Sequence, residues 1–151
     1  MAKTINKYRM PAKNIKPRDI KFNSPSHEGL KSNAIDFLMN EGTGILAAAD
    51  GVVVFAKDSS NVGGNNESYL LEDNCVILRH ANGEYSKYSH LKFRSCTARL
   101  GQSVKAGDLI AQSGNTGFTE GDRLHFEVFR TGGENPDPNA DFETLEVVFG
   151  Q

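Results

Sequence analysis

Short apolar runs, separated by glycine, asparagine and aspartate, recur along most of the 151-residue chain. Sustained helical periodicity, in which apolar residues return every three or four positions, is missing. Short runs bounded by turn-forming residues are typical of β-strands. The pattern therefore predicts an all-β fold, in which a folded-over antiparallel sheet forms a sandwich or barrel of short strands and long loops border a groove.

Two dipeptides are expected to join strands in tight hairpins. Asp50-Gly51 lies between the apolar runs of GILAAADGVVVFAKD, and Asn82-Gly83 lies within NCVILRHANGEYSKYSHL. Both dipeptides favour the positive φ angles that a two-residue hairpin turn needs. The stretch RLGQSVKAGDLIAQSGNTG is expected to hold two further short strands that meet at a Gly-Asp turn.

Three segments of the chain have a less regular pattern. Residues 59–73, SSNVGGNNESYLLED, are expected to form a long exposed loop beside a binding groove, because they are rich in glycine, asparagine and serine. Residues 1–22 are expected to be an extension strapped along the sheet, and residues 23–151 a single domain. The tail at 141–150 fits either a last strand or a short helix.

Composition narrows the class of partner. With 17 basic and 19 acidic residues the formal net charge is -2, so general attraction to nucleic acid or to a membrane surface is not expected. No segment approaches the roughly 20 apolar residues of a membrane span, and no export signal is visible. Cys75 and Cys96 are interpreted as buried thiols, with a single disulfide bridge as the alternative.

Four histidines carry the candidate chemistry: His27, His80, His90 and His125. A lone histidine on a strand is usually structural. His80 lies at the predicted hairpin and is interpreted as structural or surface-exposed. The neighbouring residues of His27 and His125 point instead to a functional role.

Asp36 lies between Ile35 and Phe37, where a carboxylate on an apolar strand needs a strong partner to offset its desolvation. A metal ion is one such partner, and a turn that Asp36 caps is the alternative. Together with His27 and His125, Asp36 would supply two imidazoles and one carboxylate, a ligand set suited to zinc. Three protein ligands leave the fourth tetrahedral position for water, as in catalytic sites.

Five motifs in order resemble those of the lysostaphin/LytM-type zinc endopeptidases: SHEGLKSNAIDF, GTGILAAADGVVV, YSKYSHL, GQSVKAGDLIAQSGNTG and RLHFEVF. The resemblance runs from about Ser26 to Pro138. The glycine motifs alone are weak, because carrier domains use similar corners. The resemblance implies a sheet fold of the duplicated hybrid motif type and makes residues 23–151 a metallopeptidase-like β domain.

The resemblance also implies roles for individual residues. His27, Asp36 and His125 would bind one zinc ion, and His90, in the Tyr-x-His-Leu segment, would act on the water or the developing oxyanion. Members of the family cut peptide cross-bridges or stems of bacterial peptidoglycan. The implied location is therefore the cell envelope, periplasmic or extracellular, and the expected state is a monomer without membrane insertion.

Arg123 departs from the family pattern, because it occupies the place of the first histidine of a His-x-His pair. Strand alternation puts Arg123 on the same face as His125, so its side chain should project toward the metal cleft. Arginine stays protonated and cannot take a proton from water, although it can donate hydrogen bonds to an oxyanion. Its charge about 6 Å from a divalent ion would cost on the order of 5 kcal/mol at an effective dielectric constant near 20.

The sequence favours a zinc-dependent endopeptidase with His90 and Arg123 as catalytic residues. The first alternative is a catalytically degenerate module that binds cell-wall peptide or regulates a partner hydrolase. A phosphocarrier, which would need two facing histidines and no metal, is a weaker alternative.

Overall fold

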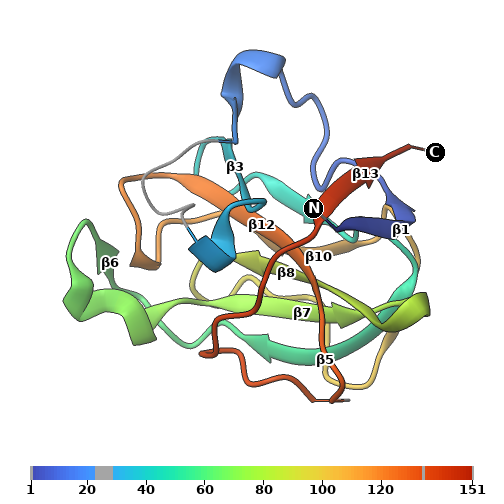
Figure 1. The fold of residues 1–151 in the computed structure, drawn as a ribbon. Coiled ribbons are helices and arrows are strands. Elements are labelled where there is room, and N and C mark those ends of the chain that lie inside the picture. The colour runs from blue at the N-terminus through green and yellow to red at the C-terminus, as the bar shows by residue number, and fades with distance from the viewer. Residues whose placement is uncertain (1, 23–28, 134, 151) are drawn as a thin grey trace.

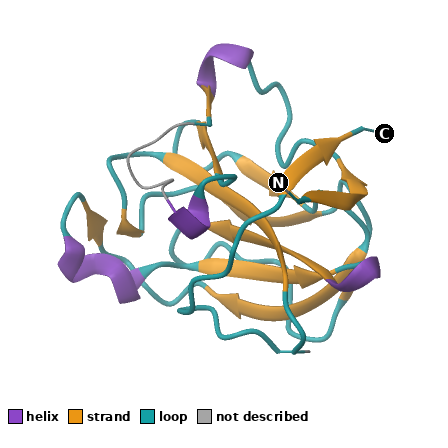
Figure 2. Ribbon diagram, in the orientation of Figure 1, coloured by secondary structure: helices purple, strands orange, loops and turns teal. Residues whose placement is uncertain are grey.

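The computed structural model describes residues 2–22, 29–133 and 135–150, which form short strands joined by loops and 3-10 helical turns (Figure 1, Figure 2). The strands are β1 (Lys3–Tyr8), β2 (Ile20–Lys21), β3 (Ile35–Leu38), β4 (Gly44–Leu46), β5 (Gly51–Lys57), β6 (Gly63–Gly64), β7 (Cys75–Arg79), β8 (Glu84–Ser89), β9 (Ser103–Val104), β10 (Leu109–Gln112), β11 (Gly117–Phe118), β12 (Arg123–Arg130) and β13 (Glu146–Phe149). The 3-10 turns are η1 (Pro17–Asp19), η2 (Gly29–Lys31), η3 (Glu67–Glu72) and η4 (Ala81–Gly83). The all-β prediction is confirmed.

A seven-stranded antiparallel sheet forms the centre of the molecule, with the strand order β2-β3-β12-β8-β7-β5-β9. The long strand β12 pairs with β3 on one side and with β8 on the other (Figure 1). Three two-stranded pairs accompany this sheet: β4 with β10, β1 with β13, and β6 with β11. The predicted folded-over arrangement of short antiparallel strands is therefore present.

The two faces of the large sheet differ in character. On β12, Leu124, Phe126 and Val128 are fully buried and point to the inner face, where Ile45 of β4 and Ile110 of β10 join them in the main core. Burying each such side chain stabilises the fold by about 1.5–3 kcal/mol. The alternate residues of β12 point to the opposite side, here called the outer face, and this face carries the candidate site.

The Asn82-Gly83 hairpin is confirmed. Strands β7 and β8 pair antiparallel on either side of it, and the two residues have φ angles of 63° and 70°. The turn thus has the left-handed backbone that its sequence favours.

The prediction of a hairpin at Asp50-Gly51 is wrong. Strand β4 pairs with β10, whereas β5 pairs with β7 and β9, so the strands before and after the dipeptide belong to different sheets. Neither residue has a positive φ angle. Gly51 is needed for a different reason, because a Cβ atom there would lie 2.5 Å from the carbonyl oxygen of Arg79.

The Gly-Asp corner forms as predicted between β9 and β10. Gly107 has a φ angle of 93°, and the backbone N–H of Asp108 donates to the carbonyl of Lys105 at 2.9 Å. The two strands then separate, because β9 pairs with β5 of the large sheet and β10 pairs with β4.

The two ends of the chain meet in one small parallel sheet. Strand β1 pairs with β13, and Tyr8 of β1 is fully buried in the main core. Of the two alternatives for the tail, the strand is the one that forms. The division at residue 22 stays a prediction, although β1 and β2 place the first residues against the rest of the fold.

The loop at 59–73 is more ordered than its composition predicts. It contains β6 and η3, and Asn66 caps η3 by accepting a hydrogen bond from the Ser68 N–H at 2.9 Å. Buried Ser60 is fixed by the amide of Asn74, which accepts from the Ser60 N–H and donates to its carbonyl. Most of the segment is exposed, as predicted, and these local bonds give it an order that its composition does not predict.

Both cysteines are free thiols. Burial raises the pKa of Cys75 and that of Cys96 to about 12 each, so both stay protonated at neutral pH. None of the helices in the described part of the chain has the length and apolar character that a membrane crossing requires.

Candidate functional site

Strand register brings the candidate residues into one row on the outer face. His125 of β12 lies directly opposite Asp36 of β3 on one side and Ser89 of β8 on the other. Directly opposed residues on paired strands project from the same face. Arg123 lies two residues before His125 and shares this face, as the alternation predicts.

Asp36 contacts both of these β12 side chains. Its Oδ1 atom lies 3.1 Å from Nδ1 of His125, and its Oδ2 atom lies 3.0 Å from Nη1 of Arg123. The carboxylate is only 2% exposed, and its cationic neighbours compensate its burial. Asp36 is inside β3, so the alternative in which it caps a turn is wrong.

Two residues that the sequence reasoning missed complete this cluster. Oε1 of Glu127, which follows His125 by two positions on the outer face, accepts a hydrogen bond from Nε2 of His125 at 2.8 Å. Nζ of Lys31, at the end of η2, donates to both carboxylate oxygens of Glu127 at 2.8 and 2.9 Å. Strand alternation was a usable signal for Glu127, whereas nothing in the sequence marked Lys31.

The cluster strongly shifts two protonation equilibria. Burial opposes a charge on His125, but hydrogen bonds and charge interactions with Asp36 and Glu127 outweigh it and raise the His125 pKa to about 9. Burial also opposes a charge on Glu127, yet the bond to His125 and the charges of His125 and Lys31 lower the Glu127 pKa to about 2. Without metal, His125 is therefore an imidazolium at neutral pH, and a metal ion would displace its proton.

His90 approaches from the end of β8 and is held in a fixed orientation. Its backbone has a φ angle of 65°, and its N–H donates to Oδ1 of Asp73 at 2.7 Å. Nδ1 of its ring donates to the carbonyl of Thr116 at 2.8 Å, which leaves Nε2 as the nitrogen able to accept a proton. The ring centroids of His90 and His125 lie 5.9 Å apart. Although burial opposes it, interaction with His90 lowers the pKa of Asp73.

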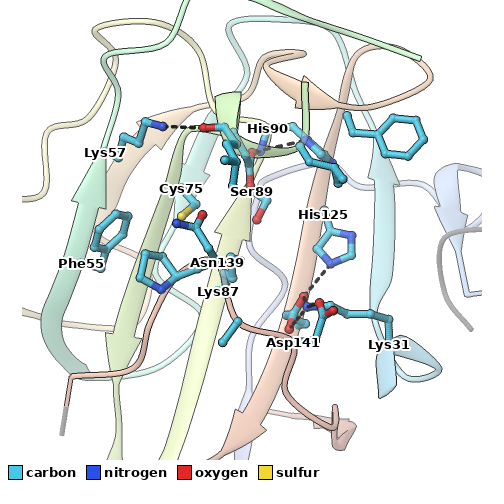
Figure 3. Close-up of a pocket in the computed structure, with 17 residues that line it drawn as sticks. Lys31, Phe55, Lys57, Cys75, Lys87, Ser89, His90, His125, Asn139 and Asp141 are labelled. Atoms are coloured by element: carbon cyan, nitrogen blue, oxygen red, sulfur yellow. Dashed lines mark hydrogen bonds and ion pairs between the residues drawn. The ribbon is translucent and has the colours of Figure 1, made fainter. Parts of the chain in front are cut away.

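A cavity of about 630 Å³ lies on the outer face and includes His90, His125 and Glu127 in its wall (Figure 3). This volume is typical of ligand sites. Lys57 and Phe55 lie at one side of the cavity and Lys31 at the other, as Figure 3 shows. The apolar part of the wall comes from Phe55, Leu70, Leu71, Phe118, Pro138 and Ala140. The predicted groove beside the 59–73 loop is therefore present, since Leu70 and Leu71 belong to that loop.

The remaining predicted residues have different outcomes. His27 lies outside the described residues. His80 is buried, and its ring bonds the Asp50 carbonyl and the Ser86 hydroxyl at 2.7 Å each, so it is structural. Arg123 faces the cluster but is not among the residues that line the cavity, and its guanidinium contacts the buried Asp36.

Comparison with known proteins gives the family. The sequence profile described as peptidase family M23 matches residues 30–138, which is most of the chain. The chain belongs to peptidase family M23. The match includes Asp36, His90, Arg123 and His125, and it begins just after His27.

The M23 relatives include both sequences and solved structures. The chain is 35% identical to an uncharacterized metalloprotease of Buchnera aphidicola, over 83% of this chain and 29% of that protein. It is 37% identical to glycyl-glycine endopeptidase ALE-1 of Staphylococcus capitis, over 74% of this chain and 26% of the relative. The catalytic domain of lysostaphin from Staphylococcus simulans superposes with a TM-score of 0.54 at 30% identity, covering 72% of this chain and 71% of that one. The chain spans only 18–29% of the first three curated relatives.

Two predicted donor atoms of this M23 chain lie at a separation compatible with binding one zinc ion. Two ligand atoms about 2.1 Å from one tetrahedral zinc ion lie about 3.4 Å apart. The corresponding separation between Nδ1 of His125 and Oδ1 of Asp36 is 3.1 Å. Glu127 engages the other ring nitrogen, as outer partners of zinc-bound imidazoles do. Within the described residues no set of three metal donors is complete, and the third predicted ligand, His27, lies outside them.

Proposed function

We propose that the chain is a zinc-dependent endopeptidase that hydrolyses peptide cross-bridges or stems of bacterial peptidoglycan. Membership of peptidase family M23 supports a peptidase. The names of two relatives support the substrate class: the peptidoglycan DD-endopeptidase ShyA of Vibrio cholerae and ALE-1. The observation that carries the proposal is the 3.1 Å approach of Asp36 to His125 beside a cavity that also presents His90.

His27, Asp36 and His125 are the proposed ligands of one zinc ion. A bound zinc ion supplies Lewis-acid chemistry, because it polarises the scissile carbonyl and brings the pKa of a water molecule toward neutrality. Asp36 and His125 present Oδ1 and Nδ1 toward each other for this purpose. Glu127 keeps the His125 ring in place through Nε2.

His90 is the proposed proton-handling residue. Its Nδ1 is occupied by the Thr116 carbonyl, so Nε2 is the nitrogen that would accept a proton from the attacking water and return it to the leaving amine. The bond from the His90 backbone N–H to Asp73 holds the ring at the wall of the cavity.

Arg123 is proposed as an electrophile that donates a hydrogen bond to the developing oxyanion. Its Nη1 atom is committed to Asp36, so another guanidinium N–H must serve, and the side chain must turn toward the cavity when substrate binds. The peptidoglycan substrate places the proposed site of action in the cell envelope, periplasmic or extracellular, and the monomer is the proposed working state.

One observation favours a second candidate, a degenerate module that binds wall peptide without cutting it. Arg123 replaces the family's histidine and pairs with a predicted zinc ligand at 3.0 Å, which opposes metal binding. The two candidates differ in zinc content and in hydrolysis.

The deciding experiment combines elemental analysis of the purified protein with digestion of purified peptidoglycan and separation of the released peptides. The proposal expects about one zinc ion per chain. It also expects that the protein releases new amino termini from peptidoglycan and that a chelator abolishes this release. Zinc-free protein that binds peptidoglycan and releases no peptides from any cross-link type would instead favour the degenerate module.

A further inference from the structure

Glu127 bridges the outer-face cluster to a distant segment of the chain. Glu127 is 1% exposed, and its carboxylate accepts a hydrogen bond from Nε2 of His125 at 2.8 Å. It also accepts two hydrogen bonds from Nζ of Lys31, at 2.8 and 2.9 Å. Lys31 lies 96 residues earlier, at the end of η2, and its side chain is 20% exposed. Both hydrogen bonds from Lys31 are charge-assisted, and such bonds are short and strong.

The orientation of His125 depends on this bridge. An imidazole ring can rotate and can carry its proton on either nitrogen. A hydrogen-bond partner at one nitrogen therefore fixes the ring orientation and the direction in which the other nitrogen faces. Because Nε2 donates to Glu127, Nδ1 is the atom that faces Oδ1 of Asp36. A rotated ring would point a C–H group at Asp36.

Lys31 in turn fixes Glu127. Without the Lys31 ammonium group the buried carboxylate would keep its hydrogen bond to His125, with Lys87, opposite it on β8, as a further cation nearby. Desolvation would then favour rotation of the carboxylate toward water or its protonation. Asp141, 3.8 Å from Lys31, is 74% exposed and cannot replace Glu127 as a buried partner. The segment that carries Lys31 is itself anchored, since the carbonyl of Leu30 accepts hydrogen bonds from the N–H and the hydroxyl of Thr144 at 2.8 and 2.9 Å.

We propose that Lys31 and Glu127 are positioning residues that fix the ring of His125 with Nδ1 toward Asp36, ready for a metal ion. The metal part of this inference rests on the proposed function, whereas the ring orientation does not. Neither residue needs to touch substrate. The inference makes Lys31, a residue outside the candidate ligand set, a determinant of zinc affinity.

The test measures zinc affinity by competition with a chromophoric chelator. Lys31→Met keeps the aliphatic stem and removes the charge, and Glu127→Gln keeps the shape and removes the charge. Each is expected to weaken zinc binding about tenfold or more, as losses of outer partners do. The double variant should weaken it little beyond the stronger single variant, because both changes break one bridge. Lys31→Arg should recover most of the affinity.

Two variants separate positioning from general stability. Lys3→Met breaks the exposed Lys3–Glu146 ion pair, in which the charged atoms lie 3.4 Å apart, and should leave zinc affinity unchanged because neither residue belongs to the cluster. Thr144→Val loosens the anchor of Leu30 and should lower the melting temperature more than it lowers zinc affinity. A Lys31→Met variant that loses affinity only as far as Thr144→Val does, at equal loss of stability, would overturn the inference.

A metal-free readout keeps this inference independent of the enzyme proposal. In wild type the Nε2–H of His125, buried against Glu127, should give an imidazole NMR signal protected from solvent exchange, and Lys31→Met and Glu127→Gln should lose it. A wild type that binds no zinc but shows the signal contradicts only the enzyme proposal. Zinc binding equal to wild type in both variants, or a signal that survives in both, overturns the positioning role.

Discussion

Nη1 of Arg123 lies 3.0 Å from Oδ2 of Asp36, and the two side chains come from adjacent strands on the outer face. The arginine that stands in place of a family histidine is thus paired with a predicted zinc ligand. The ion pair with Asp36 offsets the expected repulsion between the Arg123 charge and a divalent metal ion. It also makes the guanidinium compete with the metal ion for the same carboxylate. How the chain resolves this competition decides whether it is an active peptidase.

Arg123→Ala should lower peptide release by about a hundredfold or more, the usual loss for one oxyanion donor. Zinc should stay bound or bind more tightly, because a cation leaves the carboxylate of Asp36. Arg123→His should recover activity. Peptide release and zinc stoichiometry are the two measurements, taken on the same preparations.

Arg130→Ala is the matched control for that variant. Arg130 lies at the far end of β12 and pairs with Glu84 at 3.1 Å, so its removal also deletes an arginine and breaks an ion pair. Peptide release should be unchanged. Loss of zinc from Arg123→Ala would show that the arginine supports the ligand Asp36, and would contradict its role as an electrophile.

His90→Ala should keep its zinc and lose turnover by roughly two to four orders of magnitude, because it removes proton transfer and leaves the predicted ligands intact. Asp73→Asn, which keeps an oxygen to accept from the His90 N–H, should have a smaller effect. Metal analysis and the rate of peptide release separate the two properties. Retained turnover in His90→Ala would assign the proton transfer to another residue.

The stability of the protein should fall as the pH drops below about 6.5, the pKa of an unfolded histidine. Burial lowers the pKa of His80, although the Asp50 carbonyl and the charges of Glu84 and Asp50 partly oppose it. The unfolded state therefore binds a proton first, which favours unfolding in acid. His125 acts in the opposite direction, since its folded-state pKa of about 9 keeps it protonated while the unfolded histidine loses its proton above about 6.5; its contribution is fully present in acid and is lost as the pH rises toward 9.

Urea unfolding of metal-free wild type and His80→Asn at pH 7.5 and at about pH 5.5 isolates the His80 effect, because the opposing contribution of His125 is common to both proteins. On going from pH 7.5 to about pH 5.5, His80→Asn should lose less stability than wild type or gain stability, whatever its own cost at either pH. An unchanged slope in that variant would contradict the assignment to His80.

Glu84→Ala should lower the free energy of unfolding by about 3 kcal/mol or more, because several donors lose a charged acceptor. The fully buried carboxylate accepts from the backbone N–H groups of Ile5 and Asn6 and from the hydroxyl of Tyr8. Glu146→Ala, which breaks only an exposed pair with Lys3, should cost about 1 kcal/mol or less. Equal effects of the two substitutions in urea unfolding would contradict the anchoring role of Glu84.

Local sequence rules predicted the features that depend on neighbouring residues. Alternation placed Arg123 and His125 on one face, and the Asn82-Gly83 turn followed from backbone preferences. The predicted Asp50-Gly51 hairpin was wrong, because tertiary packing decides which strands pair. Ile45 of β4 is buried in the main core, and β4 pairs there with β10 rather than with β5.

The site was predictable as far as its chemistry is local. Asp36 stood out as a carboxylate on an apolar strand, and its closeness to His125 followed from the family resemblance. Lys31 was not predictable, since a lysine in a polar stretch carries no signal until folding brings it 2.8 Å from Glu127. Thr116 contributes to the orientation of His90 through its backbone carbonyl, which side-chain identity does not reveal.

The pairing of β1 with β13 has a consequence for the order of folding. Lys3 lies opposite Glu146, so β1 has no strand partner until β13, which comes much later in the sequence, has been made. Closing so long a loop costs entropy that only late contacts repay, which makes this pairing a late step. During synthesis β1 therefore stays without its strand partner while the central antiparallel sheet assembles around β12, although Tyr8 can already pack against Phe126 of β12.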